Sequence, residues 1–172
     1  MLIIIIGDRM KKIFIILLIM IIFTGCDIAN TPTSKVEELL GNYQRLDKNI
    51  NIDYYSLAND ENLNDDLKNK YNDLIKDQYQ NLSYEIKEEE IDGNKAIVTV
   101  SIEVINYKDA VRKYNKNEYK NTEYHNLVIN DLKKSKNKVN YTINFNLTKD
   151  NNDDWNIDEL TYETKEKLLG IN

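Results

Sequence analysis

The chain has 172 residues, a formal net charge of −6 and one histidine. That length suits one ordinary domain that buries its own core. The acidic balance excludes a surface built to hold phosphate backbones, so we expect no nucleic-acid partner.

The first 25 residues have the pattern of a secretory signal. Arg9, Lys11 and Lys12 form a positive segment, and an unbroken apolar run follows from Ile13 to Phe23. A helix of that length spans roughly 16 Å, whereas the hydrocarbon core of a bilayer is about 30 Å thick. The run is therefore too short for a stable span and suits a signal peptide. Met10, directly before the lysines, is an alternative start of the chain.

The residues after this run predict a lipid anchor. Phe23, Thr24, Gly25 and Cys26 resemble the lipobox of bacterial lipoproteins, in which small residues precede an obligatory cysteine. Phe23 departs from the usual leucine. The resemblance implies cleavage before Cys26 and a diacylglyceryl group on its thiol, and two acyl chains anchor a protein stably. The alternative is a chance cysteine after an ordinary secretory signal.

We therefore expect residues 1–25 to be a lipoprotein signal peptide and Cys26 to be the lipidation site. The expected location is the extracytoplasmic face of a cell membrane, in a Gram-positive bacterium. Residues 26–31 are small and polar and would form a lipidated tether with a reach of roughly 20 Å. Residues 32–172 would form a single domain.

The domain is predicted to begin with helices. Thr31 can cap the first helix with Pro32 at its first position, or Ser34 can cap it with Glu37 three residues later. The first helix carries apolar residues at helical spacing at Val36, Leu39, Leu40, Tyr43 and Leu46. The polar stretch over 47–62 that follows it is predicted to be a loop or a short helix. The second helix, ending near Asn81, has the stripe Leu63, Leu67, Tyr71, Leu74, Ile75, Gln78 and Tyr79.

The apolar period then changes to two, which predicts strands. Alternation over 82–86 and 96–104, with Asp92-Gly93-Asn94 between, indicates a hairpin. The segment 108–134 is helical in two pieces. Alternation resumes over 139–147, and an acidic turn at 150–154 leads to a last strand that begins at Trp155. Thr161 opens a short C-terminal helix that Gly170 ends.

This order predicts an α+β domain. N-terminal helices would pack in a curved antiparallel sheet of about four strands, with a helical insertion between the two hairpins. The arrangement resembles the cone-shaped nuclear-transport-factor-2-like (cystatin-like) fold. That resemblance is architectural and implies no particular activity.

The chain also resembles a family of uncharacterised lipoproteins from low-GC Gram-positive bacteria. The stretches that carry this likeness are 31–40, 75–86, 138–145 and 155–160. They hold structural positions and no catalytic signature. The family implies an exported domain of unknown function, so no functional residue is carried over.

Motifs for catalysis, cofactors or metals are not found in the sequence. His125 could be a general base, but without a nucleophile motif nearby it is better explained as a surface or half-buried helix residue. The count of cysteine and histidine excludes a Cys/His zinc site. The segment 150–154 faintly resembles a calcium loop, yet Trp155 stands where glycine is needed, so it is read as a hairpin turn. The acidic run 88–90 is read as a solvated strand end.

Tyrosine is the remaining candidate for ligand contact, since twelve are present. Five fall on predicted core faces, namely Tyr43, Tyr71, Tyr79, Tyr84 and Tyr141, so packing explains them first. Tyr54 and Tyr55 fit no stripe and are the candidate ligand-binding residues. Three functions remain open. The first is a non-enzymatic binding or interaction module at the cell envelope. The second is a carrier of a small ligand, or an enzyme, that uses the cone's cavity. The third is an accessory to a larger envelope assembly.

Overall fold

The computed structural model describes residues 30–172. The predicted signal peptide and Cys26 lie outside the described residues. The elements follow in the order α2 (Pro32–Arg45), α3 (Tyr55–Ala58), α4 (Asp65–Gln80), β1 (Ser83–Asp92), β2 (Lys95–Ile105), α5 (Lys108–Arg112), the 3-10 helix η1 (Lys116–Glu118), α6 (Asn121–Lys134), β3 (Lys138–Lys149), β4 (Trp155–Ile157) and α7 (Tyr162–Leu169). The predicted α+β class, with a helical insertion between two hairpins, is confirmed.

Helix α2 begins with a reciprocal cap. The Thr31 hydroxyl accepts from the backbone N–H of Ser34 at 3.1 Å, and the Ser34 hydroxyl oxygen accepts from the Thr31 N–H at 3.1 Å. Pro32 occupies the first turn, where its missing N–H costs nothing. The prediction with Thr31 as cap is therefore confirmed. The alternative with Ser34 as cap is wrong, because Ser34 is the third helical residue.

Helix α4 buries the whole stripe that the sequence predicts, except that Leu63 lies just before its start. Asn64 caps this helix by accepting from the Leu67 N–H at 3.0 Å. The polar stretch before it contains the short helix α3, so one of the two predicted readings is confirmed. Leu57 and Ala58 of α3 are buried and fix it on the domain.

The four strands form one antiparallel sheet in the order β1-β2-β3-β4. Strand β2 turns Ala96, Val98, Val100, Ile102 and Val104 into the core, which is the alternation that the sequence shows. Strand β1 is an edge strand, and its register with β2 shifts between Ile86 and Glu88. Beyond that bulge its side chains are exposed, including the predicted acidic strand end.

The short helix α7 closes the domain against α4 and β2. Gln78 of α4, which is fully buried, donates to the carbonyls of Ile105 at 2.8 Å and Leu169 at 2.9 Å. Gly170 ends α7 with a φ of 70°, the left-handed conformation that glycine adopts without strain. Its carbonyl accepts from the N–H groups of Tyr107 and Lys108. These hydrogen bonds hold α4, the end of β2 and the end of α7 together.

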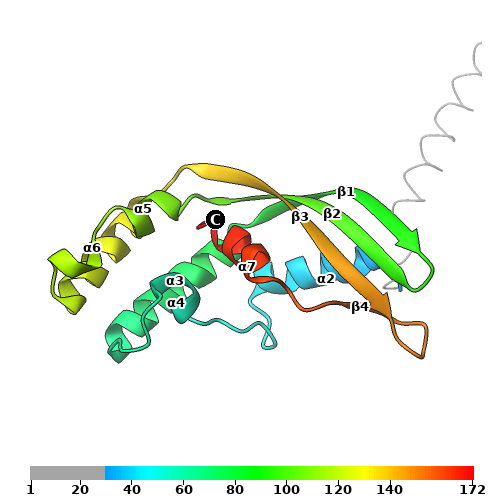
Figure 1. Cartoon of the computed structure of the whole chain (residues 1–172), viewed down its shortest axis with the longest axis horizontal. Coiled ribbons are helices and arrows are strands. Elements are labelled where there is room, and N and C mark those ends of the chain that lie inside the picture. The colour runs from blue at the N-terminus through cyan, green and yellow to red at the C-terminus, as the bar shows by residue number, and fades with distance from the viewer. Residues whose placement is uncertain (1–29) are drawn as a thin grey trace, which may run out of the picture.

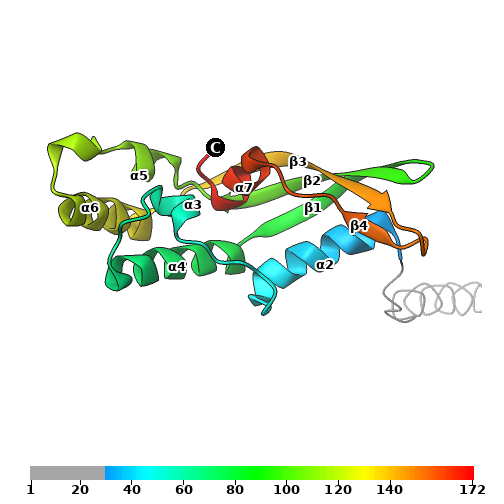
Figure 2. The same cartoon turned by 60° about the horizontal axis from the view of Figure 1, so that its bottom comes forward.

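The molecule is elongated (Figure 1). The start of α2, the β1–β2 turn and the β3–β4 turn lie at one end, and α5 and α6 lie at the other. Helices α2 and α4 lie on the same side of the sheet (Figure 2). The space between these helices and the sheet is packed with apolar side chains from α2, α4, β2, β3 and α7. The interior next to the central strands is therefore filled.

Candidate functional site

A buried polar network joins the α3–α4 connection to the helical insertion. His125 of α6 has no exposed surface. Its Nδ1 lies 2.8 Å from the Tyr71 hydroxyl, and its Nε2 lies 3.2 Å from Oδ2 of Asp60. The expectation of a surface or half-buried histidine is wrong. The reason is that α6 turns His125 inward with Val128, Ile129 and Leu132, toward partners on other elements.

Asp60 is the acceptor at the centre of this network and is only 7% exposed. Its Oδ2 also accepts from Nζ of Lys116 at 2.6 Å and from Nδ2 of Asn121 at 3.1 Å. Its Oδ1 accepts from the N–H of Asn62 at 2.8 Å. The hydrogen bond with Lys116 is the largest of the effects that hold the pKa of Asp60 well below its ordinary value, and burial opposes them. Asp60 is therefore ionised at neutral pH.

The direction of the hydrogen bonds follows from that charge. An ionised carboxylate only accepts, so Nε2 of His125 carries the proton and Nδ1 accepts from the Tyr71 hydroxyl. Burial lowers the pKa of His125 below 6.5, against the attraction of Asp60, and keeps the ring neutral. Burial also raises the pKa of Tyr71. Tyr71 is 1% exposed, so this Tyr–His–Asp chain offers no hydroxyl to a reactant.

A cavity of about 220 Å³ lies beside Tyr71. Residues from α3 to α7 line it, namely Ser56, Leu57, Ala58, Asn59, Tyr71, Val111, Arg112, Tyr124, Val128, Tyr162, Glu166 and Ile171. The Tyr124 ring meets the His125 ring edge to face at 4.9 Å. The buried network therefore supports two aromatic walls of the cavity, although Asp60 does not itself face into it.

The structure places Tyr54 and Tyr55 beside this cavity but not on its wall. The Tyr54 hydroxyl donates to the Glu61 carbonyl at 3.1 Å, and the Lys68 ammonium lies 5.4 Å from its ring centre. Tyr55 is 41% exposed. The next four residues, 56–59, line the cavity instead. A role for the two tyrosines in binding stays a prediction.

Tyr162 is the more exposed tyrosine at this place, at 74%. Repulsion by Glu166 is the first cause that raises the pKa of Tyr162, followed by burial and a hydrogen bond to Glu166. Tyr55 adds a smaller repulsion. Sequence reasoning missed Tyr162, because it follows the N-cap Thr161 and belongs to no apolar stripe.

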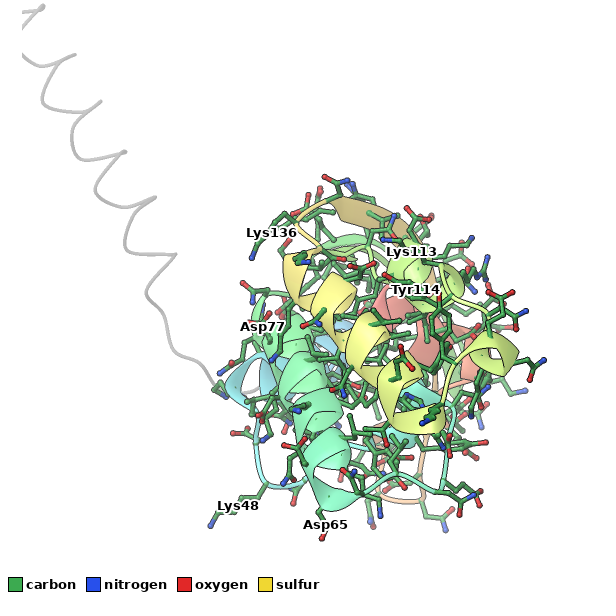
Figure 3. The ribbon with its side chains drawn as sticks, turned by 90° about the vertical axis from the view of Figure 1, so that its left-hand side faces the viewer. Lys48, Asp65, Asp77, Lys113, Tyr114 and Lys136 are labelled. Carbon is green, nitrogen blue, oxygen red and sulfur yellow. The ribbon has the colours of Figure 1, made fainter. Side chains whose placement is uncertain are left out.

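Helix α5 is fixed on α6 by one carboxylate. Oδ2 of Asp131 accepts from Nζ of Lys113 at 2.6 Å and from the Tyr114 hydroxyl at 2.9 Å. The labelled side chains of Lys113 and Tyr114 lie beside α6 in the end-on view (Figure 3). This contact holds the part of the chain that carries Arg112 and thereby shapes the cavity.

In the acidic turn at 150–154, a side chain of the turn accepts hydrogen bonds from the turn's own backbone N–H groups. Oδ1 of Asp150 accepts from the N–H groups of Asn152 at 2.8 Å and Asp154 at 3.1 Å, as in a hairpin turn. Asp153 has a φ of 64° there. Within residues 30–172, no group of three or more acidic, histidine or cysteine side chains is arranged to hold a metal ion.

No family model, no curated protein and no solved structure matches this chain. The resemblances to uncharacterised lipoproteins and to the nuclear-transport-factor-2-like fold therefore stay predictions. In the described part of the chain, every helix is too short or too polar to cross a bilayer.

Proposed function

We propose that this protein is a lipid-anchored, extracytoplasmic binding module of the cell envelope that acts without catalysis. The observation that carries the proposal is the fixed position of Asn30. Its Oδ1 accepts from the N–H of Trp155 at 3.1 Å, and its Nδ2 donates to the Asp153 carbonyl at 3.0 Å and to Asp154 Oδ1 at 2.9 Å. Asn30, which the sequence assigns to the tether, is thus attached to the β3–β4 turn.

This attachment supports a definite orientation on the membrane. Asn30 is four positions after Cys26 in the sequence, and four residues reach at most about 14 Å. A lipid on Cys26 would hold the end with the two hairpin turns close to the bilayer. The helical insertion at the opposite end of the long axis would then face outward (Figure 1).

The buried network supports the non-catalytic part of the proposal. A general base needs to reach the proton that it abstracts, and both ring nitrogens of His125 are already occupied by Tyr71 and Asp60. The filled interior beside the central strands also disfavours a reaction chamber within the cone. A second candidate, a carrier of a small ligand, is favoured by the cavity between α3 and α7.

The anchor is tested by Cys26→Ser in cells fed a labelled fatty acid. Serine offers no thiol to the diacylglyceryl group, so the lipid label should be lost and the protein released or left unprocessed. Ser34→Ala, which leaves the cysteine in place, is the control and should stay labelled. A Cys26→Ser protein with undiminished label would overturn the anchor.

The orientation and the binding role are tested with a photo-crosslinking residue at one of two exposed asparagines. Asn151 lies in the β3–β4 turn, and Asn117 lies in η1 at the other end. We expect lipid adducts from Asn151 and a discrete envelope partner from Asn117. Lipid adducts from Asn117 would overturn the orientation, and only background adducts from Asn117 would overturn a protein partner.

A further inference from the structure

We propose that the cavity between α3 and α7 binds a small zwitterion of the amino-acid type. The ligand's carboxylate would pair with Arg112 and its ammonium group with Glu166. The inference rests on the proposed binding function and names its ligand class. The cavity's charges, its walls and its size carry the argument.

The two charges on the cavity wall are of opposite sign and do not neutralise each other. Arg112 ends α5, and Glu166 belongs to α7. Among the described residues, neither takes part in an ion pair, whereas the adjacent Lys167 pairs with Glu163 at 2.8 Å. Glu166 makes a side-chain hydrogen bond with Tyr162. A ligand with both charges would therefore find a separate partner for each.

The chemistry of the two groups suits the two ends of an amino acid. A guanidinium offers paired N–H donors that match a carboxylate, and a carboxylate attracts an ammonium group. An anion without an ammonium group would meet repulsion from Glu166, and a cation without a carboxylate would meet repulsion from Arg112. The pair of charges therefore favours a zwitterion over either simple ion.

The remaining walls suit a short side chain. Tyr124 is half-buried and presents ring surface, and an ammonium group is attracted to the face of such a ring. Tyr71 also lines the cavity but is only 1% exposed. Val111 and Ile171, which are half-buried, add apolar surface. The rings are held from behind by the network of His125, so the wall is preorganised and little ordering is needed on binding.

The size of the cavity limits the ligand. Its volume of about 220 Å³ holds about seven water molecules. Pockets for drug-sized molecules begin at roughly 300 Å³. A free amino acid, or the terminal residue of a peptide with both charges close together, matches this volume better than a nucleotide or a sugar chain.

The test is calorimetric titration of the purified full chain in detergent micelles with glycine, alanine, valine and tyrosine. N-acetylalanine and alaninamide, which each lack one charge, are the matched probes. We expect at least one free amino acid to bind and both blocked forms to bind at least tenfold more weakly. Equal binding of a blocked form would overturn the zwitterion, and no binding of any free amino acid at about 10 mM would overturn the site.

Variants locate the binding. Arg112→Gln and Glu166→Gln should each weaken binding at least tenfold, and thermal unfolding would show that both remain folded. Arg45→Gln, on α2, and Glu163→Gln, one turn away on α7, are the matched controls and should bind within about twofold of the parent. Unchanged binding by Arg112→Gln would overturn the assignment. None of these results bears on the lipid label of Cys26, so the two proposals fail separately.

Discussion

Replacing Asp60 with alanine should be among the most damaging single changes in this domain. Asp60 accepts four hydrogen bonds, from Asn62, Lys116, Asn121 and His125. The substitution removes both acceptor oxygens and with them all four hydrogen bonds. Its cost depends on which donors can find water afterwards.

The four donors differ in that respect. The side chain of Lys116 is 48% exposed and Asn121 is exposed, so both regain water. His125 is fully buried, and its Nε2–H is left without an acceptor, which costs about 1–3 kcal/mol. Breaking a buried charged pair costs about 3–5 kcal/mol. Because two of the donors are accessible and His125 is neutral, we expect the lower limit, about 3 kcal/mol.

The assay is urea unfolding of the full chain, followed by the fluorescence of Trp155. That residue is 4% exposed and lies in β4, away from the substitution, so it reports global unfolding. Lys76→Ala, which removes the exposed ion pair with Asp73, is the control and should cost less than about 1 kcal/mol. The reasoning is refuted if Asp60→Ala costs no more than Lys76→Ala. A double-mutant cycle with His125→Ala should show a coupling of about 1–2 kcal/mol.

Three further outcomes are expected. Gly170→Ala should lower the free energy of unfolding by more than about 2 kcal/mol, because the new Cβ would lie 2.1 Å from the Ile105 carbonyl oxygen at a φ of 70°. Gly93→Ala, at a φ of 60° with nothing within 4 Å of its Cβ, should cost only about 1 kcal/mol. Equal losses of stability in urea unfolding would contradict the clash at Gly170. Asn30→Ala should cost about 1 kcal/mol and lower the midpoint of thermal unfolding by about 3 °C, and an unchanged midpoint would show that the attachment to the turn contributes nothing. The pKa of His125 is below 6.5 in the folded protein, so as the pH drops below 6.5 the unfolded chain binds a proton that the native chain does not. The free energy of unfolding should therefore fall as the pH drops from 6.5 toward the folded-state pKa. His125→Phe should lose the part of this pH dependence that His125 contributes.

The longer helices and the strands could be predicted from the sequence because they have local signals, whereas α3 was left open as a loop or a short helix and η1 was not predicted. Gly93 follows Asp92 at the hairpin turn, Thr161 and Gly170 flank α7, and the period of apolar residues changes where β1 begins. Such signals depend on neighbours within a few positions. The length of β1 was harder to predict, because its second half is exposed and follows a bulge that no residue pattern indicates.

The polar network and the cavity could not be predicted, because their partners are far apart in the sequence. His125 lies 54 positions from Tyr71 and 65 from Asp60. One local signal was present. His125 stands three, four and seven positions before Val128, Ile129 and Leu132, which is the spacing of one helix face. That spacing indicates that the ring points inward, but not which acceptor it meets.

The two edges of the sheet also decide how copies of this protein behave toward each other. An open sheet presents unpaired backbone groups on its outer strands, and these can join the sheet of another copy. Strand β1 interrupts its edge with the bulge after Ile86 and follows it with Glu88, Glu89 and Glu90. At the other edge, within the described residues, β4 pairs only with Leu147, Thr148 and Lys149, so most of β3 has no strand beside it there. Two copies that met along β1 would bring like charges together. The acidic strand end thus acts against the pairing of copies through β1.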